Sequence, residues 1–352
     1  MDPVTQGALG AALPQSFADK RALRGACILG LLGGMAPDLD VLIRSPSDPL
    51  LFLEFHRHFT HALVFIPLGG LLCALVLHGL IGRRFGFDFK RSYLFCTAGY
   101  ATHALLDACT TYGTLLLWPF NHVRYAWNTV SVIDPLVTVP LLVLVMTAFM
   151  SRSVWPARIA LVWVLSYLLL GLVQRDRAIE AGYSVATQRG HVPERLDAKP
   201  SFANILVWKV VYELEDQFYV DAVRVGMDVR VYPGAVVNKL DVARDFPALD
   251  SGSQQAKDIE RFRWFSNDYL APDPGFPNRI TDIRYSMIPN EVQGLWSIEI
   301  DAAAPRDRHV AYRTHRDASS ERTQQLLAML RGEADSGGQL LSGRVDASTG
   351  GQ

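Results

Sequence analysis

The chain has 352 residues, and its 34 basic and 35 acidic side chains give a formal net charge of −1. This balance excludes the basic footprint of a nucleic-acid-binding protein, while the length allows two or three domains. The hydrophobic fraction of 49% is unevenly spread, because nearly all long apolar runs lie within residues 22–173. Residues 174–352 have the dense charge of a soluble domain, so we expect a multi-span α-helical membrane domain followed by a soluble domain.

The apolar part predicts a series of helices. Residues 3–14 are too short to cross a membrane and indicate a re-entrant or interfacial helix, and residues 22–36 form a short, glycine-rich run. Four longer segments approach the roughly 20 apolar residues that a crossing needs; they are 61–81, 92–110, 134–150 and 155–173. Thr60 and Asp134 are the expected N-caps of the helices that follow them. The start lacks the basic region of a cleavable signal peptide, so the apolar helices are expected to direct insertion.

Basic residues predict the orientation of these helices. Three alternate loops carry most of them, namely Lys20, Arg21 and Arg24, then Arg83, Arg84, Lys90 and Arg91, then Arg152 and Arg158. The opposite loops, 37–60 and 111–133, carry only Arg44, Arg57 and Arg124. Because cytoplasmic loops are enriched in basic residues, we expect a multi-pass membrane protein whose C-terminal domain lies on the non-cytoplasmic side, in the periplasm or its equivalent.

Three of the apolar segments contain or adjoin acidic and histidine residues, namely Asp38 and Asp40, His56 and His61, and His103 and Asp107. An ionisable group at membrane depth costs roughly 2.5–3.5 kcal/mol on insertion scales, so these groups need compensating partners. A divalent cation is one partner that carboxylates and imidazoles share. With a rise of about 1.5 Å per helical residue, all three segments place these residues near the outer face.

The spacing of these residues indicates how a metal site would be built. His103 and Asp107 are four residues apart and therefore share one helix face. Six ligands exceed the need of one tetrahedral ion, so we expect one ion or a pair about 3.5–4 Å apart. Oxygen and nitrogen donors together suit zinc, manganese or iron, and zinc is the expected cofactor. Asp38, His61 and Asp107 are also the candidate catalytic residues, because an acid or imidazole at the rim can move a proton.

Other interpretations apply to single residues. A lone histidine in a membrane helix is more often a hydrogen-bonding partner than a ligand, and this is our interpretation of His78. His58 is either a third histidine ligand or, as we favour, a residue of the loop that supports the site. An aspartate after proline often caps a turn. The four cysteines form no CxxC pair, which argues against a thiolate zinc site. Arg57 and Arg124 either bind a phosphate or carboxylate of the substrate or extend toward the membrane interface.

Four motifs occur in an order that resembles a known family. They are Met1-Asp2-Pro3-Val4-Thr5, Pro37-Asp38-Leu39-Asp40, His56-Arg57-x-Phe59-Thr60-His61 and His103-Ala104-Leu105-Leu106-Asp107-x-x-Thr110-x-x-Gly113. They are similar to the YdjM-like family over roughly residues 1–173, a family described as inner-membrane, metal-dependent hydrolases, some under LexA control. The resemblance implies metal binding through the three Asp and three His residues above. The chain departs from it where Gln6 replaces a frequent histidine and His58 replaces the usual glycine.

The C-terminal half predicts a soluble α+β domain with an antiparallel sheet. Residues 174–190 are charged and are expected to continue the last membrane helix outward. Strands are expected at 202–211, 218–231, 280–286 and 295–300, and helices at 253–267 and 318–331. We expect His191, His309 and His315 at the surface and a disordered tail over 332–352. The predicted domains are therefore 1–173, 174–331 and 332–352.

Two functions are compatible with this reading. The first is a metal-dependent hydrolase at the outer face of the inner membrane, acting on a membrane lipid or a lipid-linked ester or phosphoester. The alternative is a non-enzymatic membrane protein with a structural metal and a C-terminal binding domain. An ion transporter is disfavoured, because the candidate ligands cluster at one face without a matching inner set. No nucleic acid is expected as a partner, and the sequence indicates no particular protein partner.

Overall fold

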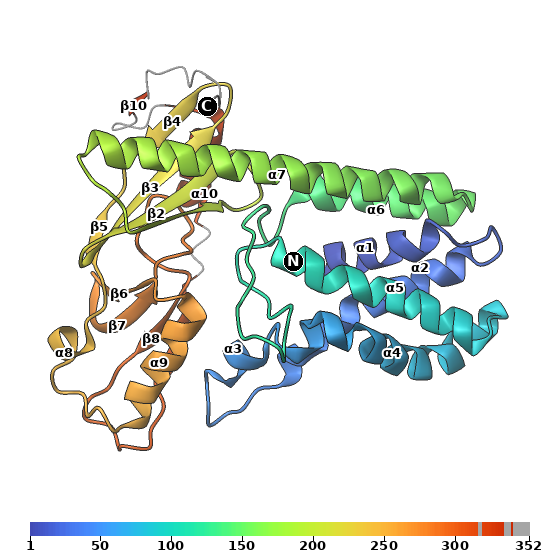
Figure 1. Ribbon diagram of the computed structural model, residues 1–352, viewed down its shortest axis with the longest axis horizontal. Coiled ribbons are helices and arrows are strands. Elements are labelled where there is room, and N and C mark those ends of the chain that lie inside the picture. Colours follow the sequence, from blue (N-terminus) through green and yellow to red (C-terminus); the bar gives the residue numbers. More distant parts are fainter. Residues whose placement is uncertain (316–318, 334–338, 341–352) are drawn as a thin grey trace, which may run out of the picture.

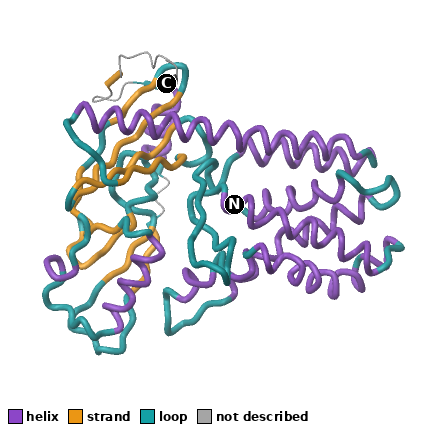
Figure 2. The backbone as a smooth tube through the Cα atoms, viewed as in Figure 1, coloured by secondary structure: helices purple, strands orange, loops and turns teal. Residues whose placement is uncertain are grey.

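The computed structural model describes residues 1–315, 319–333 and 339–340. Helices form one end of the molecule and two β-sheets the other, and the long helix α7 belongs to both (Figure 1). The separation of helix from strand is plain along the backbone (Figure 2). This arrangement confirms the predicted fold class, a helical membrane domain followed by a soluble domain with antiparallel sheets. Most of the predicted disordered tail lies outside the described residues.

The membrane domain consists of α-helices joined by short 3-10 turns. Its α-helices are α1 (Pro3–Gln15), α2 (Leu23–Met35), α3 (Leu51–Phe55), α4 (Ile66–Leu80), α5 (Phe89–Ala108), α6 (Pro135–Ser151) and α7 (Val154–Gln188). Its 3-10 turns are η1 (Ala36–Leu42), η2 (Phe59–His61), η3 (Leu63–Phe65) and η4 (Gly82–Phe85). In the described part of the chain, three helical segments are long and apolar enough to cross a membrane, namely Leu23–Leu42, Leu63–Leu80 and Val154–Gln188.

Helix α1 lies inside the helical bundle rather than at its rim. It packs against α2, α5, α6 and α7, and its residues from Thr5 to Ala12 are all buried. The interfacial alternative for this segment is therefore wrong. At about 1.5 Å per residue, α1 rises only about 20 Å, which is less than the hydrocarbon thickness of a bilayer.

Glycines allow α1, α2 and α5 to approach one another closely. A Cβ atom at Gly10 of α1 would lie 2.6 Å from the carbonyl oxygen of Gly30 in α2. A Cβ atom at Gly99 of α5 would lie 2.1 Å from the same oxygen. Small residues at such crossings are typical of membrane helices. Here they bring the C-terminal turns of α5 beside the segment that follows α2, which is where the candidate ligands lie.

The two predicted helix caps have different outcomes. Asp134 is the N-cap of α6, and its carboxylate accepts a hydrogen bond of 3.0 Å from the amide of Leu136, as predicted. Thr60 caps no helix, because it lies in the η2 turn and α4 begins only at Ile66. Its hydroxyl instead donates to Asp40 over 2.9 Å. The side chain that the sequence predicted as a helix cap therefore bonds to an acid in another segment.

Two antiparallel sheets form the C-terminal domain, where a single sheet was predicted. The larger sheet has the order β1-β2-β3-β4-β10, with β5 paired to β3, and the smaller sheet has the order β6-β7-β8-β9. The larger sheet contains β1 (Arg195–Pro200), β2 (Val207–Leu214), β3 (Gln217–Val225), β4 (Val229–Tyr232), β5 (Val236–Asn238) and β10 (Gln339–Leu340). The smaller contains β6 (Leu270–Asp273), β7 (Phe276–Asp282), β8 (Trp296–Glu299) and β9 (Ala311–Thr314).

Helices accompany both sheets. They are α8 (Val242–Asp245), α9 (Gln254–Ser266) and α10 (Ser320–Arg331), and the last two agree closely with the predicted ranges. The predicted strand at 218–231 is in fact two strands, since the chain turns between Val225 and Val229. Helix α7 continues without a break across residue 173, as the charged run after it predicted.

Three histidines of this domain lie at the surface only in part, and none is isolated as predicted. Each is partly buried, and each ring makes a hydrogen bond of 2.8 Å. His191 bonds to the hydroxyl of Tyr212, His309 to the carboxylate of Asp258, and His315 to the hydroxyl of Ser297. These histidines lie far from other candidate residues in the sequence, but the fold gives each of them a polar partner.

Candidate metal centre

The six predicted ligands come from three segments that the fold brings together. Asp38 and Asp40 lie in η1, which continues directly from α2. His56 follows α3, and His61 ends the η2 turn. His103 and Asp107 lie on one face of the last two turns of α5. Because α2 and α5 cross closely at their glycines, η1 meets this end of α5.

Four of these residues form a compact group. One ligand atom from each of Asp38, His61, His103 and Asp107 lies within 4.8 Å of all the others. Nε2 of His61 lies 3.3 Å from Asp107 Oδ2 and 3.6 Å from Asp38 Oδ1. Nε2 of His103 lies 3.5 Å and 3.3 Å from the same two oxygens. Tetrahedral bonds of about 2.0–2.1 Å to zinc imply ligand atoms about 3.3–3.4 Å apart, so the spacing fits such an ion.

The hydrogen-bonding state of the two imidazoles fits the same interpretation. Nδ1 of His103 lies 2.5 Å from the carbonyl oxygen of Gly34, and Nδ1 of His61 lies 3.2 Å from a carboxylate oxygen of Asp40. Both partners are acceptors, so each Nδ1 carries a proton, and in the neutral ring each Nε2 then has a lone pair available for a cation. Nε2 of both rings and Oδ2 of Asp107 are buried and have no hydrogen-bond partner among the described residues.

Asp40 differs from the other acids because both of its oxygens are already engaged. Oδ1 accepts from Nδ1 of His56 over 2.8 Å. Oδ2 accepts from the amide of Arg57 and the hydroxyl of Thr60, each over 2.9 Å, and also faces His61. Asp40 thus ties η1 to the loop that carries both histidines, and it orients His61. Asp38, Asp40 and His56 still form a second group with ligand atoms within 4.8 Å, which shares Asp38 with the first.

Asp107 is held by Arg57 and by two groups that were not predicted as site residues, Gln6 and the terminal amine of Met1. Its Oδ1 accepts 2.8 Å from the amide of Gln6 and also pairs with the terminal amine of Met1. Its Oδ2 lies 3.0 Å from Nε of Arg57. In the sequence, Gln6 stands out only because it replaces the histidine common in the resembling family. That replacement beside an otherwise matching motif is the one sequence feature that indicates a contact with the site.

Arg57 is buried and Arg124 is partly buried, and both guanidinium groups lie beside the ring of Tyr112. Arg57 is 4% exposed, and its guanidinium donates to the hydroxyl of Thr110 over 2.8 Å and lies 4.8 Å from the Tyr112 ring centre. Arg124 donates to the carbonyl of Gly113 over 2.9 Å, and its Nε and Nη1 have no hydrogen-bond partner among the described residues. Burial lowers the pKa of Arg124 to about 10. Extension toward the membrane interface is therefore wrong for Arg57.

The remaining candidates lie outside the two groups. The ring of His58 packs 5.3 Å from that of Trp118 and 5.7 Å from that of Phe55. His78 bonds to the hydroxyl of Ser92 over 2.9 Å, which confirms its predicted role as a hydrogen-bonding partner. Cys109 is buried and belongs to neither group.

The C-terminal domain covers the loops that hold the site. Leu50 and Leu53 of the α3 region join the apolar cluster of α9, and the hydroxyl of Tyr285 donates to the carbonyl of Thr111. The Tyr112 ring lies 5.4 Å from that of His56 and 5.0 Å from that of Phe265. Tyr112 therefore connects the candidate metal centre directly to the soluble domain.

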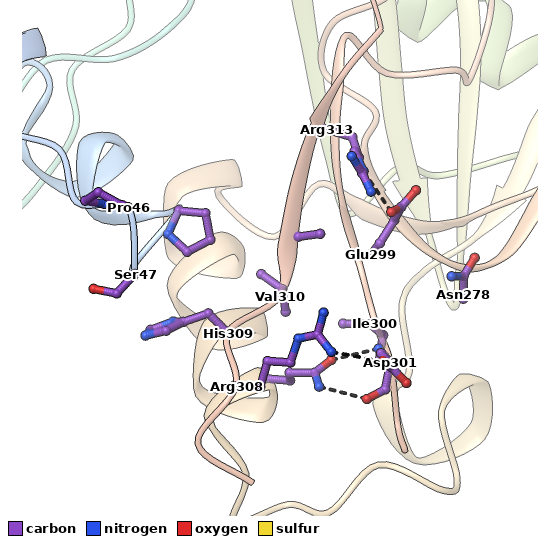
Figure 3. Close-up of a pocket in the computed structure, with 13 residues that line it drawn as sticks. Pro46, Ser47, Asn278, Glu299, Ile300, Asp301, Arg308, His309, Val310 and Arg313 are labelled. Atoms are coloured by element: carbon purple, nitrogen blue, oxygen red, sulfur yellow. Dashed lines mark hydrogen bonds and ion pairs between the residues drawn. The ribbon is translucent and has the colours of Figure 1, made fainter. Parts of the chain in front are cut away.

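A separate cavity of about 530 Å³ lies between residues 46–49 and the outer strands of the smaller sheet (Figure 3). Its charged lining residues pair with each other, as Arg313 does with Glu299 at 2.8 Å and Arg308 with Asp301 at 3.7 Å. None of its lining residues belongs to the two ligand groups. The cavity is thus distinct from the candidate metal centre.

A helical membrane bundle with a compact Asp/His group defines a class of membrane proteins able to hold a metal ion. The profile of the YdjM inner membrane protein family matches residues 1–178, and the chain belongs to that family, as the motifs predicted. It is 32% identical over 149 residues to inner membrane protein YbcI of Escherichia coli (strain K12), which is 41% of this chain and 80% of that protein. The comparison with solved structures gave no match.

Proposed function

We propose that this protein is a metal-dependent hydrolase of the inner membrane that acts on a lipid or lipid-linked phosphoester. The observation that carries the proposal is the group of three buried atoms, His61 Nε2, His103 Nε2 and Asp107 Oδ2, that face one another. None of them has a hydrogen-bond partner among the described residues. Arg57 compensates the charge of Asp107 in part, since its Nε lies 3.0 Å from Oδ2. Burial of the two imidazole nitrogens without a partner is costly unless a cation or a donor compensates them. Two nitrogens and two carboxylates are donors that suit zinc.

The residues of the site have different roles in this proposal. A divalent ion held there would polarise an ester or phosphoester oxygen and lower the pKa of a water at the site. His61 and His103 bind through Nε2, with their rings fixed by Asp40 and by the Gly34 carbonyl. Asp38 is the partly exposed member of the group, at 20%, and is therefore the ligand that a water molecule would displace; its freed carboxylate would then accept the proton of that water.

Phosphoesters are favoured over acyl esters by the charge around the site. Arg57 contacts Asp107 and therefore lies beside any substrate group bound there. Arg124 keeps two buried donor nitrogens without partners, and it ion-pairs with no carboxylate in the described part of the chain. Guanidinium groups bind phosphate oxygens strongly and in a fixed geometry. A neutral acyl ester offers no charge for these donors.

The hydrogen bonds that Asp40 already accepts favour one ion over two. A second ion bound by Asp38, Asp40 and His56 would compete with four donors that already occupy the Asp40 oxygens. We therefore propose one resident zinc ion, bound by Asp38, His61, His103 and Asp107. Elemental analysis of the purified protein distinguishes one ion per chain from two.

A structural metal in a non-enzymatic protein is the alternative, and one observation favours it. Four protein ligands complete a tetrahedral shell, as in structural zinc sites, whereas catalytic sites keep one position open. In that case the C-terminal domain would be the binding module. If the protein is a hydrolase, a variant that loses the metal also loses hydrolytic activity. If the metal is structural, there is no hydrolytic activity to lose.

The test combines metal content with a substrate screen in detergent or nanodiscs. The chain is purified with natural sequence, with His103→Ala, and with His78→Ala as the matched control in another membrane helix. We expect one zinc per chain and phosphoester-lipid hydrolysis for the natural sequence and the control, and neither for His103→Ala. The structural alternative would be supported if His103→Ala loses the metal and the natural sequence hydrolyses neither phosphoester nor acyl-ester lipids. Full metal in His103→Ala would refute the ligand set.

The side of the membrane is tested separately. The alternation of basic loops supports a periplasmic C-terminal domain. A reporter that is active only in the periplasm, fused to the C-terminus, should be active. Activity of a cytoplasm-specific reporter at the same position would reverse the orientation and place the site at the cytoplasmic face.

A further inference from the structure

Two turns at one end of the larger sheet lie beside α7 where its apolar segment ends. They are residues 201–206, between β1 and β2, and residues 226–228, between β3 and β4. The side-chain amide of Gln174 donates to the carbonyls of Ile205 and Val225, over 3.2 and 2.8 Å. Arg177 donates to the carbonyl of Gly226 over 2.5 Å. These bonds fix both turns at the level of residues 174–177.

That level coincides with the edge of a bilayer. Residues 154–173 of α7 rise about 30 Å, which equals the thickness of the hydrocarbon core. Gln174 therefore stands where α7 leaves the hydrocarbon. The neighbouring helix gives a second reference, because the amide of Ala203 bonds over 3.1 Å to Ser131, shortly before α6 begins at Pro135.

The side chains on these turns are apolar and exposed. Phe202 is 54% exposed, Leu206 is 38% exposed and Met227 is fully exposed. Val132 and Ile133, which follow Ser131 and precede α6, are exposed as well. At the opposite end of the same sheet the turn between β2 and β3 presents Glu215 and Asp216 instead. The end of the sheet beside Gln174 thus has apolar turns, and the opposite end has an acidic turn. This difference is expected if only the end beside Gln174 meets the membrane.

The far end is well separated from the near end. Strand β2 runs alongside α7, because Ile205 lies at Gln174 and Val210 packs against Gly182 farther along the helix. Val192 follows the end of α7 and is 83% exposed. With a helical rise of 1.5 Å, it stands about 20 Å or more beyond Gln174. Val192 is therefore an apolar, exposed side chain outside any membrane contact.

We propose that the turns at 201–206 and 226–228 insert Phe202, Leu206 and Met227 into the headgroup boundary of the bilayer that surrounds the protein's own helices. The occupant is the lipid surface, because hydrogen bonds to Gln174, Arg177 and Ser131 hold the turns beside the ends of the apolar segments of α6 and α7. Apolar side chains of this kind anchor surface elements at the boundary of the acyl chains. The contact holds the C-terminal domain in place over the loops of the candidate metal centre. It does not depend on the proposed hydrolase activity.

The test uses the full chain in nanodiscs with a fluorophore on a single introduced cysteine. The variants are Met227→Cys and Phe202→Cys at the patch, with Val192→Cys and Asp216→Cys as controls at the far end. The unsubstituted chain, treated in the same way, measures labelling of its native cysteines, which lie in or beside the membrane helices. All four introduced positions are exposed, so the substitutions do not disturb the core.

We expect a blue-shifted emission at 227 and 202, and at least twofold stronger quenching there by lipids that carry a nitroxide near the headgroup. The labels at 192 and 216 should emit as in water and be quenched weakly. Equal emission and equal quenching at all four positions would overturn the proposal. A blue shift at 227 without lipid quenching would overturn it as well, since it would indicate a contact with protein.

Discussion

Two clusters of acids and histidine differ in how their charges are satisfied. In the candidate metal centre, His61, His103 and Asp107 are fully buried and direct free lone pairs at one another. At the contact between α3 and α9, Asp48, Asp258 and His309 surround Arg261 instead. Arg261 donates to both aspartates over 2.9 Å, and His309 bonds to Asp258 over 2.8 Å. The same residue types form a group that could hold a metal ion in one place and a closed ion-pair network in the other.

Burial and the presence of arginine decide between these outcomes. Arg261, Asp48 and His309 remain partly exposed, so water and a fixed guanidinium both compensate the carboxylates. In the candidate metal centre His61, His103 and Asp107 are fully buried, and the Arg57 guanidinium ion-pairs with only one of its acids, Asp107. The proposed metal would compensate the remaining buried groups there, whereas Arg261 already compensates the acids of the other cluster. Four changes test this difference.

The largest effect is expected when one histidine is removed from each cluster. His61→Ala should lower the affinity for zinc by well over tenfold, since even the loss of a supporting contact costs about 10- to 100-fold. His309→Ala should leave zinc content unchanged. Zinc bound per chain, measured after dialysis against a competing chelator, reports both. Equal zinc content in the two variants would remove the distinction between the clusters.

A smaller effect is expected for Asp40, which orients His61 rather than completing the tetrahedral group. Asp40→Asn should weaken zinc binding by about 10- to 100-fold, while stoichiometry at saturating zinc stays at one ion. Titration of the metal-free protein measures both quantities. If saturating stoichiometry falls from two ions to one, Asp40 is itself a ligand of a second ion.

Arg261→Ala should loosen the contact between the domains without affecting the metal. The expected loss of stability is about 1 kcal/mol, because the pairs are partly exposed and screened by solvent. Hydrogen exchange of the α9 amides should become faster, and zinc content should be unchanged. A loss of zinc in this variant would show that the contact and the metal centre are coupled.

The smallest effect concerns pH. Burial of Asp48 opposes its ionisation, but hydrogen bonds from Arg261 outweigh this, and the pKa of Asp48 lies below its usual value of 3.8. A lowered folded-state pKa means that the contact is stabilised above about pH 4 and weakens as the pH falls further. Exchange of the α9 amides should therefore accelerate below pH 4, corrected for the intrinsic rate. In Arg261→Ala this additional acceleration should disappear.

The sequence by itself determined the order of the helices, the family and the residues of the candidate site. Asp and His are so costly within apolar segments that their presence at 38, 40, 56, 61, 103 and 107 was informative without any coordinates. The continuation of α7 past residue 173 and the helices near 253–267 and 318–331 followed from periodicity and charge. These signals are local or depend on composition, which is why they could be read from the chain alone.

Only the tertiary structure decided how these residues divide their roles. Asp38 and Asp40 are equivalent in sequence, yet Asp40 is saturated by donors from the 56–61 loop while Asp38 faces the two imidazoles. Thr60 and Gln6 donate hydrogen bonds to acids in distant segments, Thr60 to Asp40 and Gln6 to Asp107. The division of the C-terminal strands between two sheets likewise depends on pairing across long separations. Such contacts depend on how the segments pack, and no local pattern encodes them.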